Sequence, residues 1–162
     1  LTPGPRVVPA KAGQARNRVS AAEGRRLLGV VDDATATPIE GGWAITWAQR
    51  PVSLNSERRG DGRASQIARA KSTAVWKSQF AAAAVKAGVP RHDRVAVTVR
   101  CSMRRGRLQD TGNAYPSAKA AIDGLVAAGV IADDTGEHLA SITFEAPTRG
   151  DDSFTLELRP AP

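Results

Sequence analysis

Cysteine and histidine are scarce in this chain, and their scarcity excludes several kinds of site. The 162 residues contain one cysteine, Cys101, and two histidines, His92 and His138. A single cysteine cannot form an intramolecular disulfide, and with two histidines it cannot supply the closely spaced ligands of a zinc site. We therefore expect a protein of a reducing compartment.

Long apolar runs are also missing. No stretch approaches the roughly 18 consecutive apolar residues of a membrane-spanning helix, and residues 1–14 lack the apolar core of a signal peptide. We expect a soluble, cytoplasmic protein with no membrane partner. The length suits one domain, and residues 1–19 are rich in Pro, Gly and basic residues without an apolar period. We predict a basic arm over residues 1–42 and one domain over residues 43–162.

Positive and negative charges are segregated along the sequence. Residues 50–107 carry 14 basic and 3 acidic side chains (net +11), whereas residues 108–152 carry 2 basic and 8 acidic ones (net −6). Basic side chains bind phosphates, and carboxylates hold divalent metal ions. The pattern is therefore typical of a metal-dependent nuclease, although two solvated faces of opposite charge would give the same pattern.

Two helices are predicted from apolar periodicity and from the glycines that follow them. The first covers residues 64–87 and the second covers residues 116–128. In the first helix, Trp76 and Phe80 are interpreted as core residues rather than as a base-stacking surface. Arg63 and Lys71 could contact phosphates from this helix, or could simply be solvated.

Four strands are predicted around these helices, which gives an α/β domain of the α+β type with a small mixed sheet. They cover residues 43–47, 94–101, 139–144 and 153–158. The last two flank a Gly150-Asp151 turn, so we expect them to form an antiparallel hairpin. Period-two alternation places Cys101 on an apolar face, so we interpret it as a core residue and not as a nucleophile.

The most informative polar residues surround the second helix. Asp110 and Asn113 precede it, Lys119 and Asp123 are one turn apart within it, and Asp133-Asp134 follows it. The ends of such a helix are about 18 Å apart, so these carboxylates meet only if the chain folds back or a second subunit contributes. Alternatively, Asp110 and Asn113 could cap the helix, Lys119–Asp123 could be a surface ion pair, and Asp133-Asp134 could form a turn.

The order of these elements resembles the signature of the RusA family of Holliday junction resolvases. That signature has an Asp-x-Asp-Asn element, then Lys-x-x-x-Asp-x-Leu, Ala-Gly-Val and an acidic pair. The matching elements here are Asp110…Asn113, Lys119–Leu125, Ala128–Val130 and Asp133-Asp134. Tyr115-Pro116 before the lysine is similar to RusA-like proteins of actinobacteria and their phages. Pro51–Asn55 resembles the start of the family, so the likeness covers roughly residues 43–159.

The resemblance implies a homodimeric crossover junction endodeoxyribonuclease that cuts four-way DNA junctions by paired nicks in recombination and repair. It implies that Asp110, Asp133 and Asp134 bind Mg²⁺, for which Mn²⁺ can substitute, and that Lys119 lies near the scissile phosphate. No small-molecule cofactor is implied. We expect branched DNA to contact these residues: Arg63, Lys71, Arg104, Arg105, Arg107, Asn113 and Lys119. The resemblance places the protein in the cytoplasm of a bacterium, encoded by the cell, a prophage or a phage.

The sequence departs from the family pattern at Gly112, which stands where the second Asp of the Asp-x-Asp-Asn element is expected. The gap from Asn113 to Lys119 is also longer than in the best-known members. Two other functions therefore stay open. One is a non-catalytic DNA-binding module that has lost its metal site, and the other is a less specific nuclease acting on flaps or forks.

Overall fold

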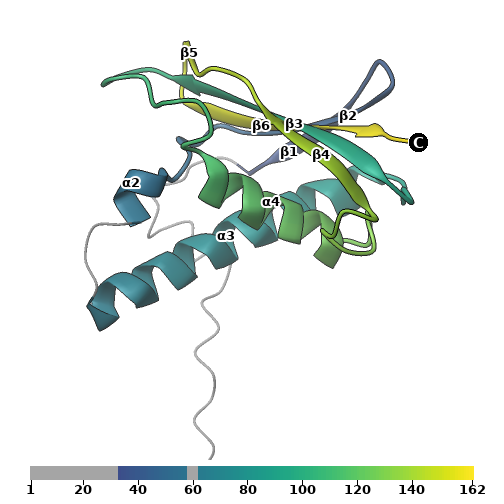
Figure 1. Ribbon diagram of the computed structural model, residues 1–162, viewed down its shortest axis with the longest axis horizontal. Helices are drawn as coiled ribbons and strands as arrows, with labels where there is room; N and C mark the ends of the chain where they lie inside the picture. Colours follow the sequence, from purple (N-terminus) through teal and green to yellow (C-terminus); the bar gives the residue numbers. More distant parts are fainter. Residues whose placement is uncertain (1–32, 58–61) are drawn as a thin grey trace, which may run out of the picture.

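A computed structural model describes residues 33–57 and 62–162, so most of the predicted arm lies outside the described residues. The described residues form two layers, a sheet and a pair of long helices on one of its faces (Figure 1). The strands are β1 (Thr35–Ile39), β2 (Gly42–Trp47), β3 (Val95–Met103), β4 (Leu139–Phe144), β5 (Thr148–Arg149) and β6 (Ser153–Pro160). The helices are α2 (Leu54–Glu57), α3 (Arg63–Ala87) and α4 (Tyr115–Ala127). The predicted α+β class is confirmed.

Both long helices lie within one residue of their predicted bounds. Helix α3 contains neither Gly nor Pro and ends at Gly88, whose φ of +67° is the left-handed conformation that glycine adopts without strain. The N–H of Gly88 bonds to carbonyl groups of the last turn. Helix α4 has Pro116 in its first turn, where the missing N–H of proline costs no hydrogen bond. Local sequence signals therefore set the end of α3 and the start of α4.

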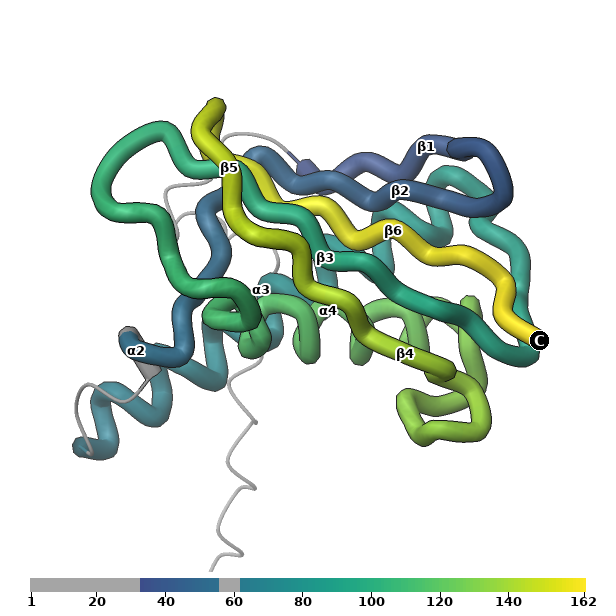
Figure 2. Tube along the Cα trace, turned by 45° about the horizontal axis from the view of Figure 1, so that its top comes forward, coloured from purple at the N-terminus to yellow at the C-terminus, as the bar shows by residue number. Residues whose placement is uncertain are grey.

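The order of the strands corrects one prediction. The sheet runs β1-β2-β6-β3-β4, with β5 also paired to β3. Strand β6 is antiparallel to both β2 and β3, whereas β4 is parallel to β3. The predicted hairpin of the last two strands is therefore wrong, because β4 and β6 lie on opposite sides of β3 (Figure 2). Helix α4 connects β3 to β4, and such a crossover returns the chain to pair in parallel.

The sheet begins within the segment that we assigned to the arm, because residues 35–39 form β1 and β2 starts at residue 42. Strand β1 pairs antiparallel with β2, with Thr35 opposite Thr46. The strand was missed because it is short and contains Pro38, which is tolerated only at an edge position such as this one. Just before it, the N–H of buried Ala34 donates to the side-chain Oε1 of Gln79 on α3 at 3.0 Å. This bond ties the start of the sheet to the helix layer.

The core lies between the sheet and the two long helices. The predicted apolar face of β3 is confirmed, because Val95, Val97, Val99 and Cys101 are all buried. Trp76 and Phe80 of α3 are 1% and 0% exposed, so they are core residues, as predicted, and cannot stack on bases. Their rings pack with each other and with Trp47 and Phe154 at centroid distances of 4.7 to 5.9 Å. No helix in the described part of the chain is long and apolar enough to cross a membrane.

Candidate active site

Lys119 of α4 lies between two carboxylates. Its Nζ is 2.5 Å from Oδ1 of Asp123 and 2.5 Å from Oδ2 of Asp134. The two carboxylate oxygens are therefore at most 5.0 Å apart, because both contact the same nitrogen. The three side chains keep 42%, 33% and 30% of their surface exposed, so solvent reaches the cluster. We call these three residues the Lys119 cluster.

The cluster forms because the chain folds back after α4. Asp123 follows Lys119 by one helical turn, so the helix alone brings these two together. Gly129, at φ +75°, ends the helix, and the chain then buries Val130 and Ile131. The carbonyl of Val130 accepts a hydrogen bond from the N–H of His92 at 2.8 Å. These contacts hold the returning loop, which carries Asp134 to Lys119 without help from a second subunit.

The two carboxylates keep the cluster charged. Burial lowers the pKa of Lys119, but the hydrogen bonds and charges of Asp123 and Asp134 outweigh this effect and raise the pKa above its ordinary value. The hydrogen bond from Lys119 lowers the pKa of Asp134. Lys119 is therefore a cation and Asp134 an anion at neutral pH, which is the state needed to bind a phosphate or a metal ion.

The other predicted site residues lie outside these contacts. Oδ1 of Asp133 accepts the N–H of Asp134 at 2.7 Å, as in a turn. Asp110 is exposed, and its backbone carbonyl accepts the N–H of Asn113 at 3.0 Å. The N-cap of α4 is Ala114, and no side chain makes a capping hydrogen bond there. Capping by Asp110 or Asn113, one of the alternatives above, is therefore wrong.

Metal binding can be judged from the oxygen ligands that the fold gathers. Within residues 33–57 and 62–162, no three His, Cys, Asp or Glu side chains are close enough together to hold a metal ion. Asp123 and Asp134 do converge. Mg²⁺ is commonly bound by one or two carboxylates, with waters and substrate phosphates completing its shell. The pair therefore fits Mg²⁺ as a site shared with substrate, rather than as a site made by protein alone.

The segment Pro51–Asn55 lies beside the start of α4. The N–H of Val52 donates to Oγ of buried Ser117 at 2.8 Å, and the N–H of Leu54 donates to the carbonyl of Asn113 at 2.9 Å. Segment 51–55 and the start of α4 are thus joined by hydrogen bonds. Ser117 was not among the predicted site residues, because its contact with Val52, which is distant in the sequence, becomes visible only in the fold.

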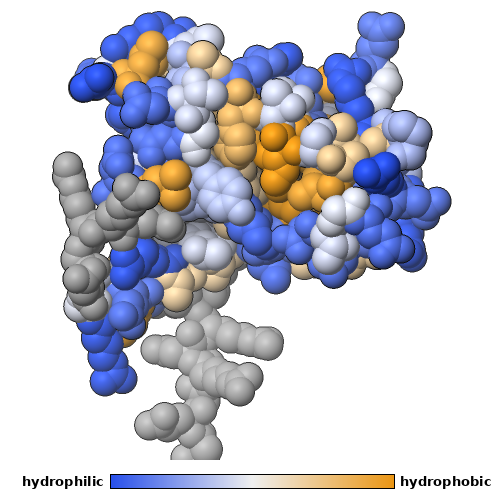
Figure 3. Space-filling model, viewed as in Figure 1, coloured by the Kyte–Doolittle hydropathy of each residue, from blue (hydrophilic) through white to orange (hydrophobic). Residues whose placement is uncertain are grey.

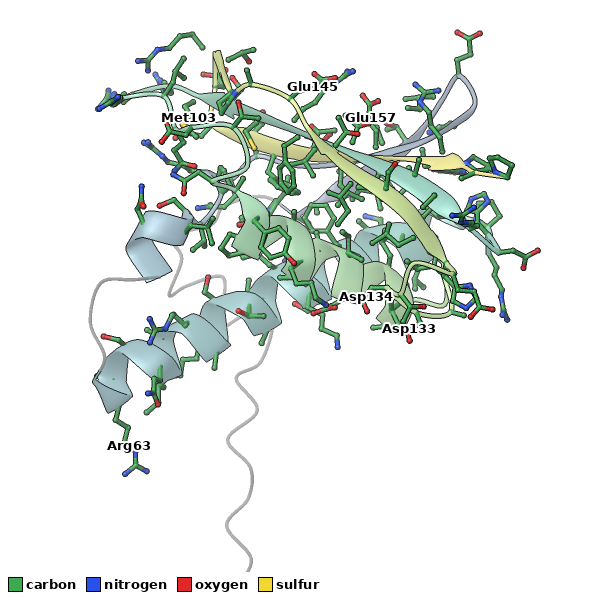
Figure 4. The ribbon with its side chains drawn as sticks, in the orientation of Figure 1. Arg63, Met103, Asp133, Asp134, Glu145 and Glu157 are labelled. Carbon is green, nitrogen blue, oxygen red and sulfur yellow. The ribbon has the colours of Figure 1, made fainter. Side chains whose placement is uncertain are left out.

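The basic residues that we predicted to contact DNA lie in two separate places. Arg104, Arg105 and Arg107 are exposed on the loop between β3 and α4, whereas Arg63 points into solvent at the far end of α3 (Figure 4). Lys71 lies further along α3 and is half-buried. In the same view, the β3 end at Met103 is well separated from Asp133 and Asp134. The loop arginines therefore adjoin the start of α4, and the Asp pair adjoins its other end.

Arg50 is a further basic residue near this loop, and the sequence analysis did not single it out. Its Nη1 donates to the carbonyl of Arg105 at 3.0 Å. Its Nη2 lies 3.8 Å from Sδ of Met103. The one feature of the sequence that could have drawn attention to Arg50 is its position directly before Pro51–Asn55. Arg50 holds the arginine-bearing loop against the end of the sheet.

Comparison of the sequence with protein-family models and with curated proteins gives no match.

Proposed function

We propose that this protein is a Mg²⁺-dependent endodeoxyribonuclease of the RusA type, which cuts four-way DNA junctions by paired nicks. The observation that carries the proposal is the position of Lys119, 2.5 Å from each of two carboxylates at a solvent-accessible place. A cation beside two anions can hold a phosphate on one side and a divalent metal ion on the other. The joined segments 51–55 and 113–117 support the same proposal.

In this function, Lys119 donates hydrogen bonds to a non-bridging oxygen of the scissile phosphate. Its charge offsets the negative charge that builds on the phosphoryl oxygens during hydrolysis. Asp123 and Asp134 keep the lysine protonated and orient its ammonium group. Lys119 would leave one of its two carboxylates when it moves to the phosphate.

Asp134 and Asp123 are the residues that would hold Mg²⁺, with Asp110 and Asp133 as the further ligands implied by the family resemblance. When bound, Mg²⁺ offers positions for phosphate oxygens and for a water of lowered pKa, and Mn²⁺ could supply the same chemistry. The carboxylates suit both Mg²⁺ and Mn²⁺, because these ions prefer oxygen ligands. Asn113 would orient the loop that carries Asp110.

The DNA would approach along α4 from the arginine-bearing loop. Arg104, Arg105 and Arg107 would contact phosphates there, and Arg50 would keep their loop in position. Two copies related by a two-fold axis would present two Lys119 clusters to opposed strands of a junction. Contacts from Arg63 and Lys71 are also part of the proposal, although Arg63 lies far from the cluster.

Cleavage of a synthetic four-way junction tests the proposal. The wild-type protein should give paired, symmetric nicks with Mg²⁺ or Mn²⁺ and none with EDTA. Lys119→Ala and Asp134→Asn should each lower the rate by about 10²- to 10³-fold, the usual effect of losing a group that stabilises transition-state charge. Asp151→Asn, an exposed carboxylate in the turn before β6, is the matched control and should cleave normally. Equal activity in all four proteins would reject the proposal.

A second candidate is a DNA-binding module without nuclease activity. It is favoured by Gly112, which replaces an expected ligand, and by the engagement of both convergent carboxylates with Lys119. Tight junction binding, with no cleavage in Mg²⁺ or Mn²⁺, would support this candidate. Linear duplex, flap and fork substrates in the same assay separate a junction nuclease from a less specific one.

A further inference from the structure

Tyr115, in the first turn of α4, is an exposed aromatic residue near the Lys119 cluster. It is the single tyrosine of the chain, and 45% of its surface is exposed. Among the described residues, the other large hydrophobic side chains exposed to this degree are Ile67 and Val85, both on α3. A single exposed apolar residue is ordinary, so the surroundings of Tyr115 decide whether it has a role.

Tyr115 occupies the same face of α4 as Lys119. The two residues are four positions apart, and Asp123 is four positions further on. Side chains at this spacing have Cβ atoms about 5–6 Å apart. A molecule held by the ammonium of Lys119 and extending toward the start of α4 would therefore meet the tyrosine ring.

The ring is held in place by a neighbour on the sheet. Its centroid lies 6.3 Å from that of Phe144 on β4, with the ring planes tilted by 43°. Phe144 is half-buried and belongs, with Leu139 and Ile142, to the apolar residues of β4 that pack against the core. Apolar side chains gather between α4 and β4 on this face of the molecule (Figure 3). The contact with Phe144 restricts the ring before any ligand arrives, which reduces the entropy lost on binding.

We propose that Tyr115 stacks on the exposed face of a nucleobase next to the phosphate held at Lys119. This inference rests on the proposed function. A nucleotide joins a flat apolar base to an anionic phosphate, and α4 presents an aromatic ring one turn from a cation. The arginine-bearing loop that leads into α4 adds charge that favours a polyanion over an apolar protein partner.

The stacking role defines a substrate class. Bases inside an intact duplex already stack on their neighbours, so their faces are not available to a side chain. A base in a single-stranded segment offers its face freely, and a base pair at the exchange point of an open junction lacks a stacking neighbour on one side. The preferred substrate is therefore DNA that is unpaired or distorted beside the scissile phosphate, and an intact duplex gains nothing from Tyr115.

The test compares three substitutions of Tyr115 in the full chain. Tyr115→Phe keeps the aromatic ring, Tyr115→Leu keeps apolar bulk without a flat face, and Tyr115→Ala removes both. The probes are a four-way junction with 2-aminopurine at the exchange point and a linear duplex, both measured with Ca²⁺ in place of Mg²⁺ to prevent cleavage. Val85→Ala, an exposed apolar residue of α3, is the matched control.

We expect Tyr115→Leu and Tyr115→Ala to weaken junction binding by roughly tenfold, the usual loss for one stacked base. Duplex binding should change by less than about twofold, because no free base is offered there. Tyr115→Phe and Val85→Ala should match the wild type on both probes. The 2-aminopurine fluorescence should be quenched by the wild type and Tyr115→Phe, and less by Tyr115→Leu.

Other results would overturn the stacking role. Equal losses on junction and duplex would indicate a general structural effect, and full junction affinity in Tyr115→Leu would indicate simple apolar packing. Asp134-dependent cleavage without any effect of Tyr115 would reject stacking but keep the nuclease. Ring-dependent quenching without cleavage would keep stacking and reject the nuclease, whereas failure to bind either DNA would reject both.

Discussion

Gly124 of α4 lies directly against the backbone of Lys77 in α3. A Cβ atom on Gly124 would stand 2.6 Å from the carbonyl oxygen of Lys77 and 3.1 Å from the backbone nitrogen of Ala81. Real Cβ atoms do not approach a backbone oxygen so closely, so a side chain here would push the helices apart. Asp123 of the Lys119 cluster is the preceding residue. The packing of α4 on α3 at Gly124 therefore also helps to position this carboxylate.

Gly124→Ala should therefore destabilise the protein, although alanine is normally the better helix former. The gain in helix propensity is about 1 kcal/mol, whereas overpacking of a tight interface costs about 1–3 kcal/mol. We expect a net loss of about 1 kcal/mol in urea unfolding. Gly136→Ala, where an added Cβ meets nothing within 4 Å, should change stability far less. A more stable Gly124→Ala protein would show that the helices can separate without cost.

Gly112 has a conformational reason to be glycine. Its φ is +84°, in the left-handed region, while an added Cβ would meet nothing within 4 Å. Gly112→Ala should thus lose about 1 kcal/mol through backbone strain alone. Gly112→Asn should lose less, because asparagine tolerates this region better. Equal unfolding free energies for wild type and Gly112→Ala would mean that the loop relaxes to a negative φ.

The ion pair of Lys119 and Asp134 predicts a particular dependence of stability on pH. The pKa of Asp134 is lowered, so its contribution is complete above the ordinary carboxyl pKa of about 4 and is lost as the pH falls through the lowered value. The pKa of Lys119 is raised, so its contribution is complete below about 10.4 and is lost as the pH rises through the raised value. Between these limits the contribution is constant.

Unfolding of the wild type and Asp134→Asn at several pH values checks this window. The difference in unfolding free energy should be small, because both side chains are partly exposed, and should be the same at pH values from about 5 to about 9. It should shrink below about pH 4. A difference that grows as the pH falls would contradict the assignment of Asp134 as the ionised partner.

Cys101 should be unreactive in the folded protein. It is 7% exposed, and burial raises the pKa of its thiol to about 11. Thiol reagents attack the thiolate, which is scarce at pH 8 when the pKa is so high. We expect negligible reaction with Ellman's reagent in buffer and one equivalent in denaturant. Rapid labelling of the native protein would mean that the end of β3 opens readily.

Single elements of this fold were predictable from the sequence, but their pairing was not. Period-two alternation identified β3, and an uninterrupted apolar period identified α3. Neither pattern says which strand lies next to which. The parallel pairing of β4 with β3 follows from the path of the chain through α4, which packs against α3 with a close contact at Gly124. Strand β1 was not predicted, because most residues of this edge strand are exposed and it therefore lacks a marked apolar pattern.

The candidate site, too, was predictable only in part. The Lys119–Asp123 pair follows from helical spacing and was visible in the sequence. The approach of Asp134 depends on burial of Val130 and Ile131, which fixes the path of the loop. The family resemblance grouped Lys119 with Asp134, although spacing alone could not show that they touch. The roles of Asp110 and Asp133 as ligands stay predictions.

Strand β6 is the last of the described strands along the sequence, yet it lies between β2 and β3 in the sheet. The first two strands and the β3–β4 unit therefore remain separate half-sheets until β6 is inserted between them. During synthesis on a ribosome, the sheet cannot close before residues 153–160 have left the exit tunnel. Most of the closing contacts join residues far apart in sequence, which slows folding. The two half-sheets would expose unpaired edges until β6 has left the tunnel, so the nascent chain is most vulnerable to aggregation during this interval.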